Sequence, residues 1–281
     1  GDYIHLIADG NGDWVAVEKT PGALVSDFYY YYDVQVLTKI AKLLGKSEDE
    51  QAYTQLGAQI KEAFHREFYD AKRGVYANGT QTANTLALFL DLVPKDAQGA
   101  VSGNLFNDIV YAHDSHVTTG FIGVKYLLPL LTRNGQADLA YDLAAKTTYP
   151  SWGYMIENGA TTLWELWQKR LGPSMNSHNH PMMGSIGAWF YEALAGINAE
   201  TPGYERLRIQ PQIVRDLTWA SASVESVRGT ISSSWTHSPG IITLDVTIST
   251  NSVATVMIPK DIEMTEVTVR EGERVVWENG K

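Results

Sequence analysis

The chain of 281 residues contains no cysteine, so disulfide bonds, thiolate nucleophiles and cysteine-ligated zinc are excluded. It has no run of about 18 apolar residues and no visible signal peptide, and we expect no membrane insertion. Positive charge is in the minority, with 22 Lys and Arg against 32 Asp and Glu and a net charge of −10. Because an acidic chain repels phosphate backbones, nucleic acid is not an expected partner.

Several catalytic sequence frames are also missing. The chain has no GxSxG elbow for a serine nucleophile, and the GNGDW stretch (residues 10–14) lacks the lysine of a phosphate-binding loop. His113 and His116 lie three residues apart, and His178 and His180 lie two apart, but neither pair sits in an HExxH frame. We therefore expect no metal and no cofactor.

Aromatic residues are abundant, with 8 Trp and 15 Tyr, and they are densest in YPSWGYMIENGATTLWELW, residues 149–167. Within this stretch a threonine can cap a helix that begins at Leu163, which would put Glu165 in the first helical turn. Flanking Trp164 and Trp167 would exclude water from the carboxylate and raise its pKa unless a cation or donor compensates. The alternative is a first-turn glutamate that complements the helix dipole, with both indoles in the core.

Apolar residues recur at helical spacing in the first two thirds of the chain, and the helices are largely paired. The predicted helices cover residues 24–44, 50–68, 80–92, 120–131, 134–147 and 184–195, with a less regular segment at 96–111. Gly45 is expected to end the first helix. From residue 204 onward, alternating Val, Ile, Thr and Ser predict an antiparallel β-sandwich of six to eight strands.

The predicted fold is therefore α + β in two domains. Residues 1–200 would form part of an (α/α)6 toroid of helical hairpins, and residues 201–281 a jelly-roll-like β-sandwich. In a toroid of hairpins, the loops at one end collect over a central cup. These loops carry Asp13, Trp152, Glu165 and His180. Two functions stay open here: glycoside hydrolysis by a pair of carboxyl groups, or a sugar-binding or lyase-type toroid in which Tyr and His move protons.

Five ordered stretches resemble bacterial α-L-rhamnosidases of glycoside hydrolase family 78. They are GNGDW (10–14), QTANTLAL (81–88), HVTTGFIGVKYLLPLL (116–131), residues 149–167 quoted above, and SHNHPMMGSIGAWFYEALAGI (177–197). Together with the C-terminal β-domain, they cover nearly the whole chain. The resemblance implies an (α/α)6 toroid followed by a β-sandwich, and hydrolysis of terminal α-L-rhamnosyl residues with inversion.

The resemblance also implies roles for five residues. Glu165 matches the family's catalytic base, and His180 matches its sugar-contacting histidine. Asp13, Trp14 and Trp152 match positions that we carry over as sugar contacts. For Asp13, local sequence alone favours a surface turn in which the carboxylate acts as a cap.

One feature of the family is missing. Its general acid lies in a motif of the form D…RDE..GW.GD, which does not occur in these 281 residues and which we expect before Gly1. Because the chain also opens without Met, we expect a fragment or processed product that is inactive alone and needs the upstream part of the same enzyme. The alternatives are a non-catalytic rhamnose-binding module and a different α/α-toroid glycosidase. A periplasmic or cell-surface location suits a polysaccharide-degrading enzyme, and a cytoplasmic location is the alternative.

Overall fold

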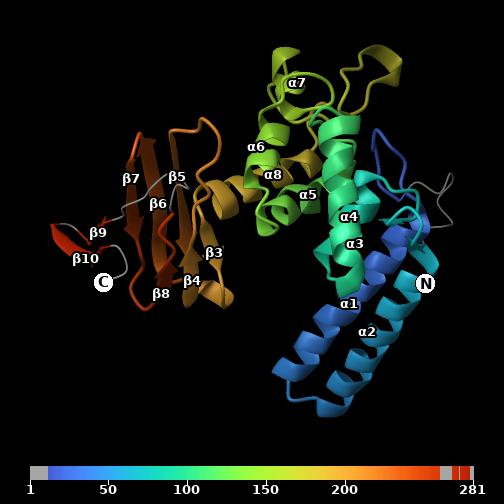
Figure 1. Ribbon diagram of the computed structural model, residues 1–281, viewed down its shortest axis with the longest axis horizontal. Helices are drawn as coiled ribbons and strands as arrows, with labels where there is room; N and C mark the ends of the chain where they lie inside the picture. The colour runs from blue at the N-terminus through green and yellow to red at the C-terminus, as the bar shows by residue number, and fades with distance from the viewer. Residues whose placement is uncertain (1–11, 260–267, 272, 279–281) are drawn as a thin grey trace. The chain divides into compact units, whose positions relative to one another are not determined.

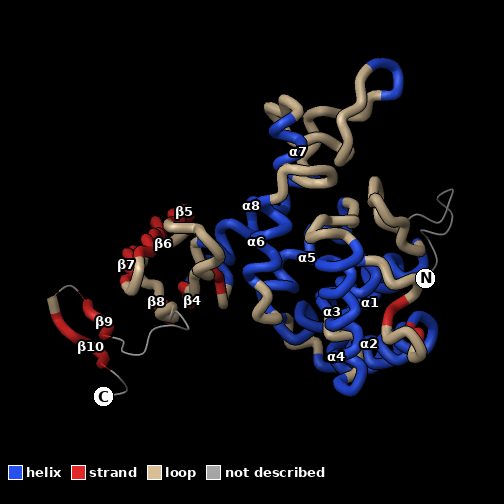
Figure 2. The backbone as a smooth tube through the Cα atoms, turned by 45° about the horizontal axis from the view of Figure 1, so that its top comes forward, coloured by secondary structure: helices blue, strands red, loops and turns tan. Residues whose placement is uncertain are grey.

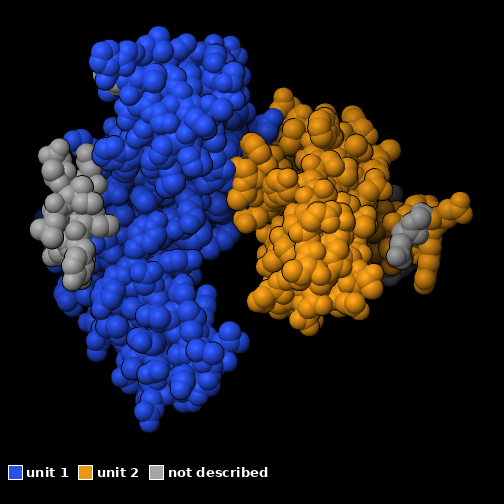
Figure 3. Space-filling view, turned by 180° about the vertical axis from the view of Figure 1, so that it is seen from behind, with its two compact units in different colours: residues 1–186 blue, residues 187–281 orange. Residues whose placement is uncertain are grey.

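The computed structural model describes residues 12–259, 268–271 and 273–278. The chain divides into two compact units, residues 1–186 and 187–281, shown in Figure 3. The domain boundary that we predict from the sequence, between residues 200 and 201, stays a prediction. In the described residues no helix is long and apolar enough to cross a membrane.

Unit 1 is built from helical hairpins, drawn in blue to green in Figure 1. Its elements are α1 (Gly22–Leu43), α2 (Ser47–Phe68), β1 (Tyr69–Asp70), β2 (Val75–Tyr76), α3 (Gln81–Phe89), α4 (Lys95–Asn107), the π-helical turn η2 (Asp108–Ala112), α5 (Phe121–Arg133), α6 (Ala137–Ala145), α7 (Trp152–Glu157) and the 3₁₀ turns η3 (Gly172–Ser174) and η4 (Met182–Gly184). The helix α8 (Ser185–Trp189) crosses the division between the units.

The α1–α2 hairpin is closed as the sequence predicts. Gly45 has a φ of 67°, the left-handed conformation that glycine adopts without a steric penalty. Its backbone N–H donates to the carbonyl of Lys42 at 3.1 Å, and Lys46 N–H donates to Ala41 at 2.9 Å. These two bonds satisfy carbonyls at the end of α1, so the chain reverses within three residues.

Helix α3 is the buried centre of unit 1, and polar side chains at its start bond to the segments around it, whereas the buried Thr85 hydroxyl has no hydrogen-bond partner among the described residues. Thr80 caps the helix by accepting the N–H of Ala83 at 3.2 Å. The Gln81 side chain donates to the carbonyl of His116 at 3.0 Å and accepts the N–H of Thr118 at 2.9 Å. The loop that leads into α5 is therefore fixed to α3.

Unit 2 contains two three-stranded sheets and a separate β-hairpin. Its elements are the π-helical turn η5 (Phe190–Leu194), β3 (Ile197–Ala199), the 3₁₀ turn η6 (Pro202–Tyr204), β4 (Arg206–Ile209), β5 (Trp219–Ser226), β6 (Gly229–Ser238), β7 (Ile241–Thr247), β8 (Val253–Val256), β9 (Thr268–Glu271) and β10 (Arg274–Glu278). One sheet has the order β3-β4-β8, the other β5-β6-β7, and β9 pairs with β10.

The two larger sheets share one core. Leu207 and Ile209 of β4 and Ile231 of β6 are fully buried in the same apolar cluster. The sheets therefore pack face to face, as in the sandwich predicted from the sequence. One pair differs from the antiparallel expectation, because β4 and β8 run parallel.

Candidate active site

Asp13, Trp14, Glu165 and His180 lie in loops and turns of unit 1, which are tan in Figure 2. Trp152, which the sequence predicts in a loop, is instead the first residue of α7. After α7 the chain is irregular, and the helix predicted to begin at Leu163 is absent. The backbone from Leu163 to Glu165 pairs instead with residues 177–180. Glu165 N–H donates to the carbonyl of Ser177 at 2.9 Å, and His180 N–H donates to that of Leu163 at 2.9 Å. This cross-pairing replaces helical hydrogen bonds and fixes Glu165 beside His180.

The carboxylate of Glu165 accepts hydrogen bonds from two distant parts of the chain. Trp14 Nε1–H donates to Oε1 at 3.1 Å, and the backbone N–H of Ser177 donates to Oε2 at 3.1 Å. The pKa of Glu165 is lowered, chiefly by the Trp14 hydrogen bond and then by that of Ser177, with smaller contributions from the Asn176 side chain and the charge of His180. Glu165 is thus a hydrogen-bond acceptor and potential base at neutral pH.

The two tryptophans that flank Glu165 in sequence do not enclose its carboxylate. Both indoles are buried: Trp164 stacks on the His178 ring with centroids 4.9 Å apart, and Trp167 Nε1–H donates to the Thr119 carbonyl at 2.7 Å. The expected rise of the Glu165 pKa by an indole wall is therefore wrong. The sequence analysis allowed for a donor that offsets this rise, and the structure shows one, the Trp14 indole N–H.

His180 presents one ring nitrogen to the protein. Its Nδ1 lies 3.4 Å from the backbone N–H of Met182, which donates to it, and its ring stacks on Phe121 with centroids 4.8 Å apart. In the neutral ring an accepting Nδ1 leaves Nε2 as the donor. His180 can therefore offer an N–H to a ligand hydroxyl next to Glu165, and this contact stays a prediction.

Asp13 is 2% exposed, and its carboxylate faces the start of α5. It accepts hydrogen bonds from the backbone N–H groups of Gly120, Ile122 and Gly123, at 2.8, 2.8 and 3.3 Å, and from the Thr82 hydroxyl. Burial raises the pKa of Asp13, while these four donors favour the carboxylate. In this structure Asp13 caps α5 and holds the turn that carries Trp14; its sugar contact stays a prediction.

Trp14 and Trp152 differ in accessibility. Trp14 is 54% exposed even though its N–H is bonded to Glu165, so part of its ring is open to a ligand. Trp152 is 6% exposed, packs edge-on against Trp167 at 5.1 Å between centroids, and donates its N–H to the Met183 carbonyl at 2.9 Å. Trp152 thus supports the wall behind the site, and its sugar contact stays a prediction.

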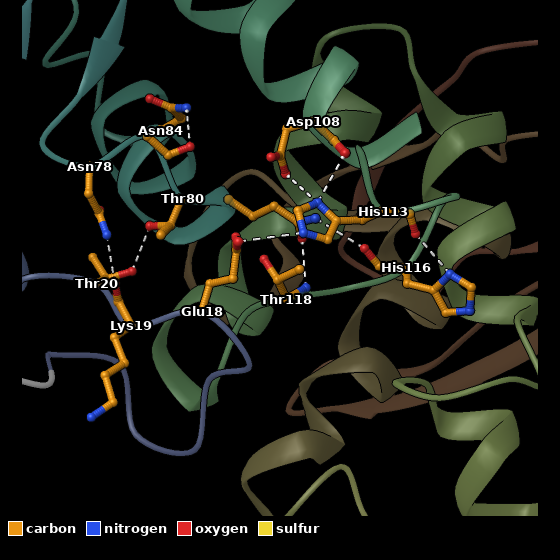
Figure 4. Close-up of polar contacts among 12 residues, drawn as sticks. Glu18, Lys19, Thr20, Asn78, Thr80, Asn84, Asp108, His113, His116 and Thr118 are labelled. Carbon is orange, nitrogen blue, oxygen red and sulfur yellow. Dashed lines mark hydrogen bonds and ion pairs between the residues drawn. The ribbon is translucent and has the colours of Figure 1, made fainter. Parts of the chain in front are cut away.

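The segment that follows Trp14 is held by a chain of three side chains, in which the His113 ring lies between the carboxylates of Asp108 and Glu18 (Figure 4). His113 Nδ1 lies 3.2 Å from Asp108 Oδ2, and His113 Nε2 lies 3.5 Å from Glu18 Oε1. These residues are spaced closely enough to hold a metal ion. However, both ring nitrogens of His113 already contact a carboxylate. This arrangement suits a structural link between η2 and Glu18 better than a metal site.

Sequence reasoning missed Glu18, Asp108 and the donors of residues 176–177. His113 was considered with His116, but His116 bonds to Thr148 Oγ1 at 2.7 Å and to the His113 carbonyl at 2.9 Å. Glu18 and His113 are far apart in sequence and meet only through tertiary packing. The donor at Ser177 is a backbone N–H, which every residue except proline carries, so the sequence cannot single it out.

Family models account for both units. Residues 1–194 match the bacterial alpha-L-rhamnosidase 6 hairpin glycosidase domain, and residues 196–273 match the bacterial alpha-L-rhamnosidase C-terminal domain. The chain is 38% identical over 261 residues to an alpha-L-rhamnosidase of Streptomyces avermitilis, covering 90% of this chain and 25% of that protein.

Solved structures that resemble this chain are also alpha-L-rhamnosidases. The alpha-L-rhamnosidase from Dictyoglumus thermophilum superposes with a TM-score of 0.90 at 40% identity, over 95% of this chain and 31% of that one. The Streptomyces avermitilis enzyme complexed with L-rhamnose gives 0.85 at 35% identity, over 95% of this chain and 27% of that one. The chain therefore spans only about a quarter to a third of the length of these relatives.

Proposed function

The chain belongs to the bacterial α-L-rhamnosidase family, and on this premise we propose that it supplies the general base of an inverting α-L-rhamnosidase. The observation that carries the proposal is the state of Glu165. Its carboxylate is oriented by Trp14 and Ser177, and its pKa is lowered by their hydrogen bonds. A base must be ionised to accept a proton, and these contacts keep Glu165 ionised at neutral pH.

In the proposed reaction Glu165 takes a proton from a water molecule as the water oxygen bonds to the anomeric carbon of an α-L-rhamnosyl unit. The glycosidic carbon–oxygen bond breaks, and the departing oxygen takes a proton from a general acid. Attack from the opposite face inverts the anomeric centre. Inverting enzymes hold the two carboxyl groups about 6.5 to 9.5 Å apart to leave room for the water.

The remaining proposed roles concern binding. The exposed part of the Trp14 ring stacks on the sugar, and His180 Nε2–H donates to a sugar hydroxyl. Asp13 and Trp152 are proposed as sugar contacts by the resemblance, and because both are buried and bonded to the chain they also have a supporting role. Asp13 positions the Trp14 turn, and Trp152 supports the wall behind residues 163–180.

We place the general acid in the upstream part of the same enzyme, because its motif does not occur in these residues. The outer side of α1 supports such a partner. It exposes large apolar side chains, among them Leu37, Ile40 and Leu43. Helices normally bury such a face, and upstream helices of the toroid would cover it.

The test compares hydrolysis of an aryl α-L-rhamnoside by this chain and by the gene product extended upstream of Gly1. We expect turnover only in the extended protein, since loss of a general acid commonly costs about 10² to 10⁴ in rate. In the extended protein, Glu165→Gln should retain L-rhamnose binding and lose turnover.

Three results would contradict the proposal. Turnover by this chain alone would show that the acid is not missing. Turnover by the Glu165→Gln protein would remove the base assignment. Inactivity of both wild-type proteins would favour a binding module or a different sugar.

A further inference from the structure

The strands β5, β6 and β7 form one sheet (Figure 1), and one face of it is mostly polar and solvent-exposed. Burial alternates along all three strands, with exposed residues at every second position of β5 and β7. The opposite face carries Ile231 and Trp235, which are 0% and 1% exposed. Because side chains alternate between the two faces of a strand, the inner side forms the core and the outer side contacts solvent.

Strand register aligns the outer side chains in rows. Ser221 of β5 lies opposite Ser234 of β6, which in turn lies opposite Asp245 of β7. In the next row Trp219 lies opposite Thr236. We call these five residues the hydroxyl face. Opposed residues of antiparallel strands project on the same side of a sheet, with strands about 4.8 Å apart and rows about 6.8 Å apart.

The hydroxyls of this face are available to a ligand. Among the described residues, the side chains of Ser221, Ser234 and Thr236 make no hydrogen bond to another protein group. A hydroxyl can donate one hydrogen bond and accept two, as can the hydroxyls of a sugar. Because the serine and threonine side chains are short, an extended chain can lie along the rows.

Trp219 adds an apolar platform at one end of this surface. Its side chain is 63% exposed, although burial of an indole would favour stability. An exposed indole beside a grid of hydroxyls provides both halves of sugar recognition, namely a planar face for the C–H side of a ring and polar groups for its hydroxyls.

Charge narrows the class of ligand. The strands β5, β6 and β7 contain no Lys or Arg, and Asp245 lies on the hydroxyl face. A surface with carboxylates and without cations repels polyanions. Repulsion therefore disfavours polyanionic chains, and the hydroxyl rows and the Trp219 indole suit an uncharged, hydroxyl-rich chain.

We propose that the hydroxyl face of unit 2 is a binding surface for a neutral polysaccharide, with Trp219 stacking on one sugar ring and the hydroxyl rows bonding its neighbours. This surface belongs to a different unit from Glu165. The choice of a rhamnose polymer as ligand rests on the proposed function. The role of the surface would be to retain the enzyme on a polymer.

The test is native affinity electrophoresis of the full 281-residue chain in gels that contain a dissolved neutral rhamnan. Any contribution of unit 1 is common to the wild-type chain and to variants of unit 2, so the comparison between them isolates the hydroxyl face. We expect retardation of the wild-type chain. Trp219→Ala should weaken apparent affinity about tenfold or more, as expected for a lost aromatic contact of roughly 1.4 kcal/mol.

Two further variants sharpen the test. Ser234→Arg places a long side chain across the middle of the hydroxyl face and should also reduce retardation. Val227→Ala is the matched control, because Val227 is 91% exposed in the turn between β5 and β6, away from the rows. It should behave as wild type. Thermal unfolding of each variant reports whether the sandwich is intact.

The proposal is overturned if the wild-type chain is not retarded, or if Trp219→Ala and Ser234→Arg both migrate as wild type. Retardation by a polyanionic glycan and not by the rhamnan would also overturn it. The hydrolase proposal is distinguishable, because Trp219→Ala in the upstream-extended protein should leave hydrolysis of an aryl rhamnoside unchanged.

Discussion

At the scale of single residues, the chemistry of Glu165 is set by groups far from it in sequence. Its strongest donor is the Trp14 indole, 151 positions away, followed by the backbone of Ser177. Both favour the ionised carboxylate and oppose the smaller effect of burial. A glutamate that stays ionised is suited to accept a proton rather than to donate one.

Replacing Trp14 by Phe tests this control directly. The change keeps an aromatic ring and removes the N–H that lowers the Glu165 pKa. Activity requires ionised Glu165, so it is lost as pH falls through that pKa. We therefore predict that the acidic limb of kcat/KM moves to higher pH in the upstream-extended protein carrying Trp14→Phe.

Trp164→Phe is the control for this measurement. Trp164 is adjacent to Glu165 in sequence but stacks on His178 and is not among the groups that shift the Glu165 pKa. Its pH profile should keep the wild-type acidic limb. A Trp14→Phe profile that coincides with wild type would show that Trp14 does not set the state of the base.

The sequence indicated which residues belong to the candidate site better than it indicated what surrounds them. The resemblance singled out Glu165 and His180, and the two lie together. The local alternative for Asp13 was a cap in a surface turn; the side chain is instead buried, and it caps the start of α5, which lies far away in sequence. The Trp14–Glu165 bond was not predictable, because no local pattern specifies contact between segments separated by most of unit 1.

At the scale of elements, the backbone at the start of α5 lies directly against the backbone at Trp14. The backbone N–H of Phe121 donates to the Trp14 carbonyl at 3.0 Å. A Cβ atom at Gly120 would lie 2.0 Å from that carbonyl oxygen and 2.7 Å from the Ala16 nitrogen. Both contacts are with backbone, which cannot move aside as a flexible side chain can.

We predict that Gly120→Ala destabilises the chain by about 1 to 3 kcal/mol, the usual range for overpacking. It should also reduce turnover of the extended protein, because the displaced turn carries the donor to Glu165. Chemical denaturation measures the first effect, and hydrolysis of an aryl rhamnoside measures the second.

Gly103→Ala, in the same unit, should have the opposite effect on stability. Gly103 lies inside α4, and a Cβ atom there would meet no heavy atom within 4 Å. Alanine should stabilise the helix by about 0.5 to 1 kcal/mol. Equal effects of the two substitutions would contradict the steric explanation for Gly120.

Elements with a strong period were predictable, and those fixed by tertiary pairing were not. The helix expected over 24–44 corresponds to α1, and that over 50–68 to most of α2. The expected helix at Leu163 is absent, because residues 163–165 bond to 177–180. Local propensity cannot reveal such a partner in a segment rich in Gly, Pro and buried indoles.

At the scale of the whole molecule, the change in composition near residue 201 correctly indicated a helical part followed by a β part. The chain belongs to the bacterial α-L-rhamnosidase family, and our proposal is an active site whose base is Glu165 and whose acid lies in the upstream part of the same enzyme. The hydroxyl face would add polymer binding in unit 2. Neither proposal requires a cofactor.

The most direct measurement of the central claim uses Glu165→Ala in the upstream-extended protein, with an aryl α-L-rhamnoside that has a good leaving group. Without its base the protein should lose about 10² to 10⁴ in turnover. Added azide needs no deprotonation and should restore turnover, giving a rhamnosyl azide of inverted β configuration by NMR. Undiminished turnover without azide, or an azide product of retained α configuration, would contradict the assignment of Glu165 as the general base.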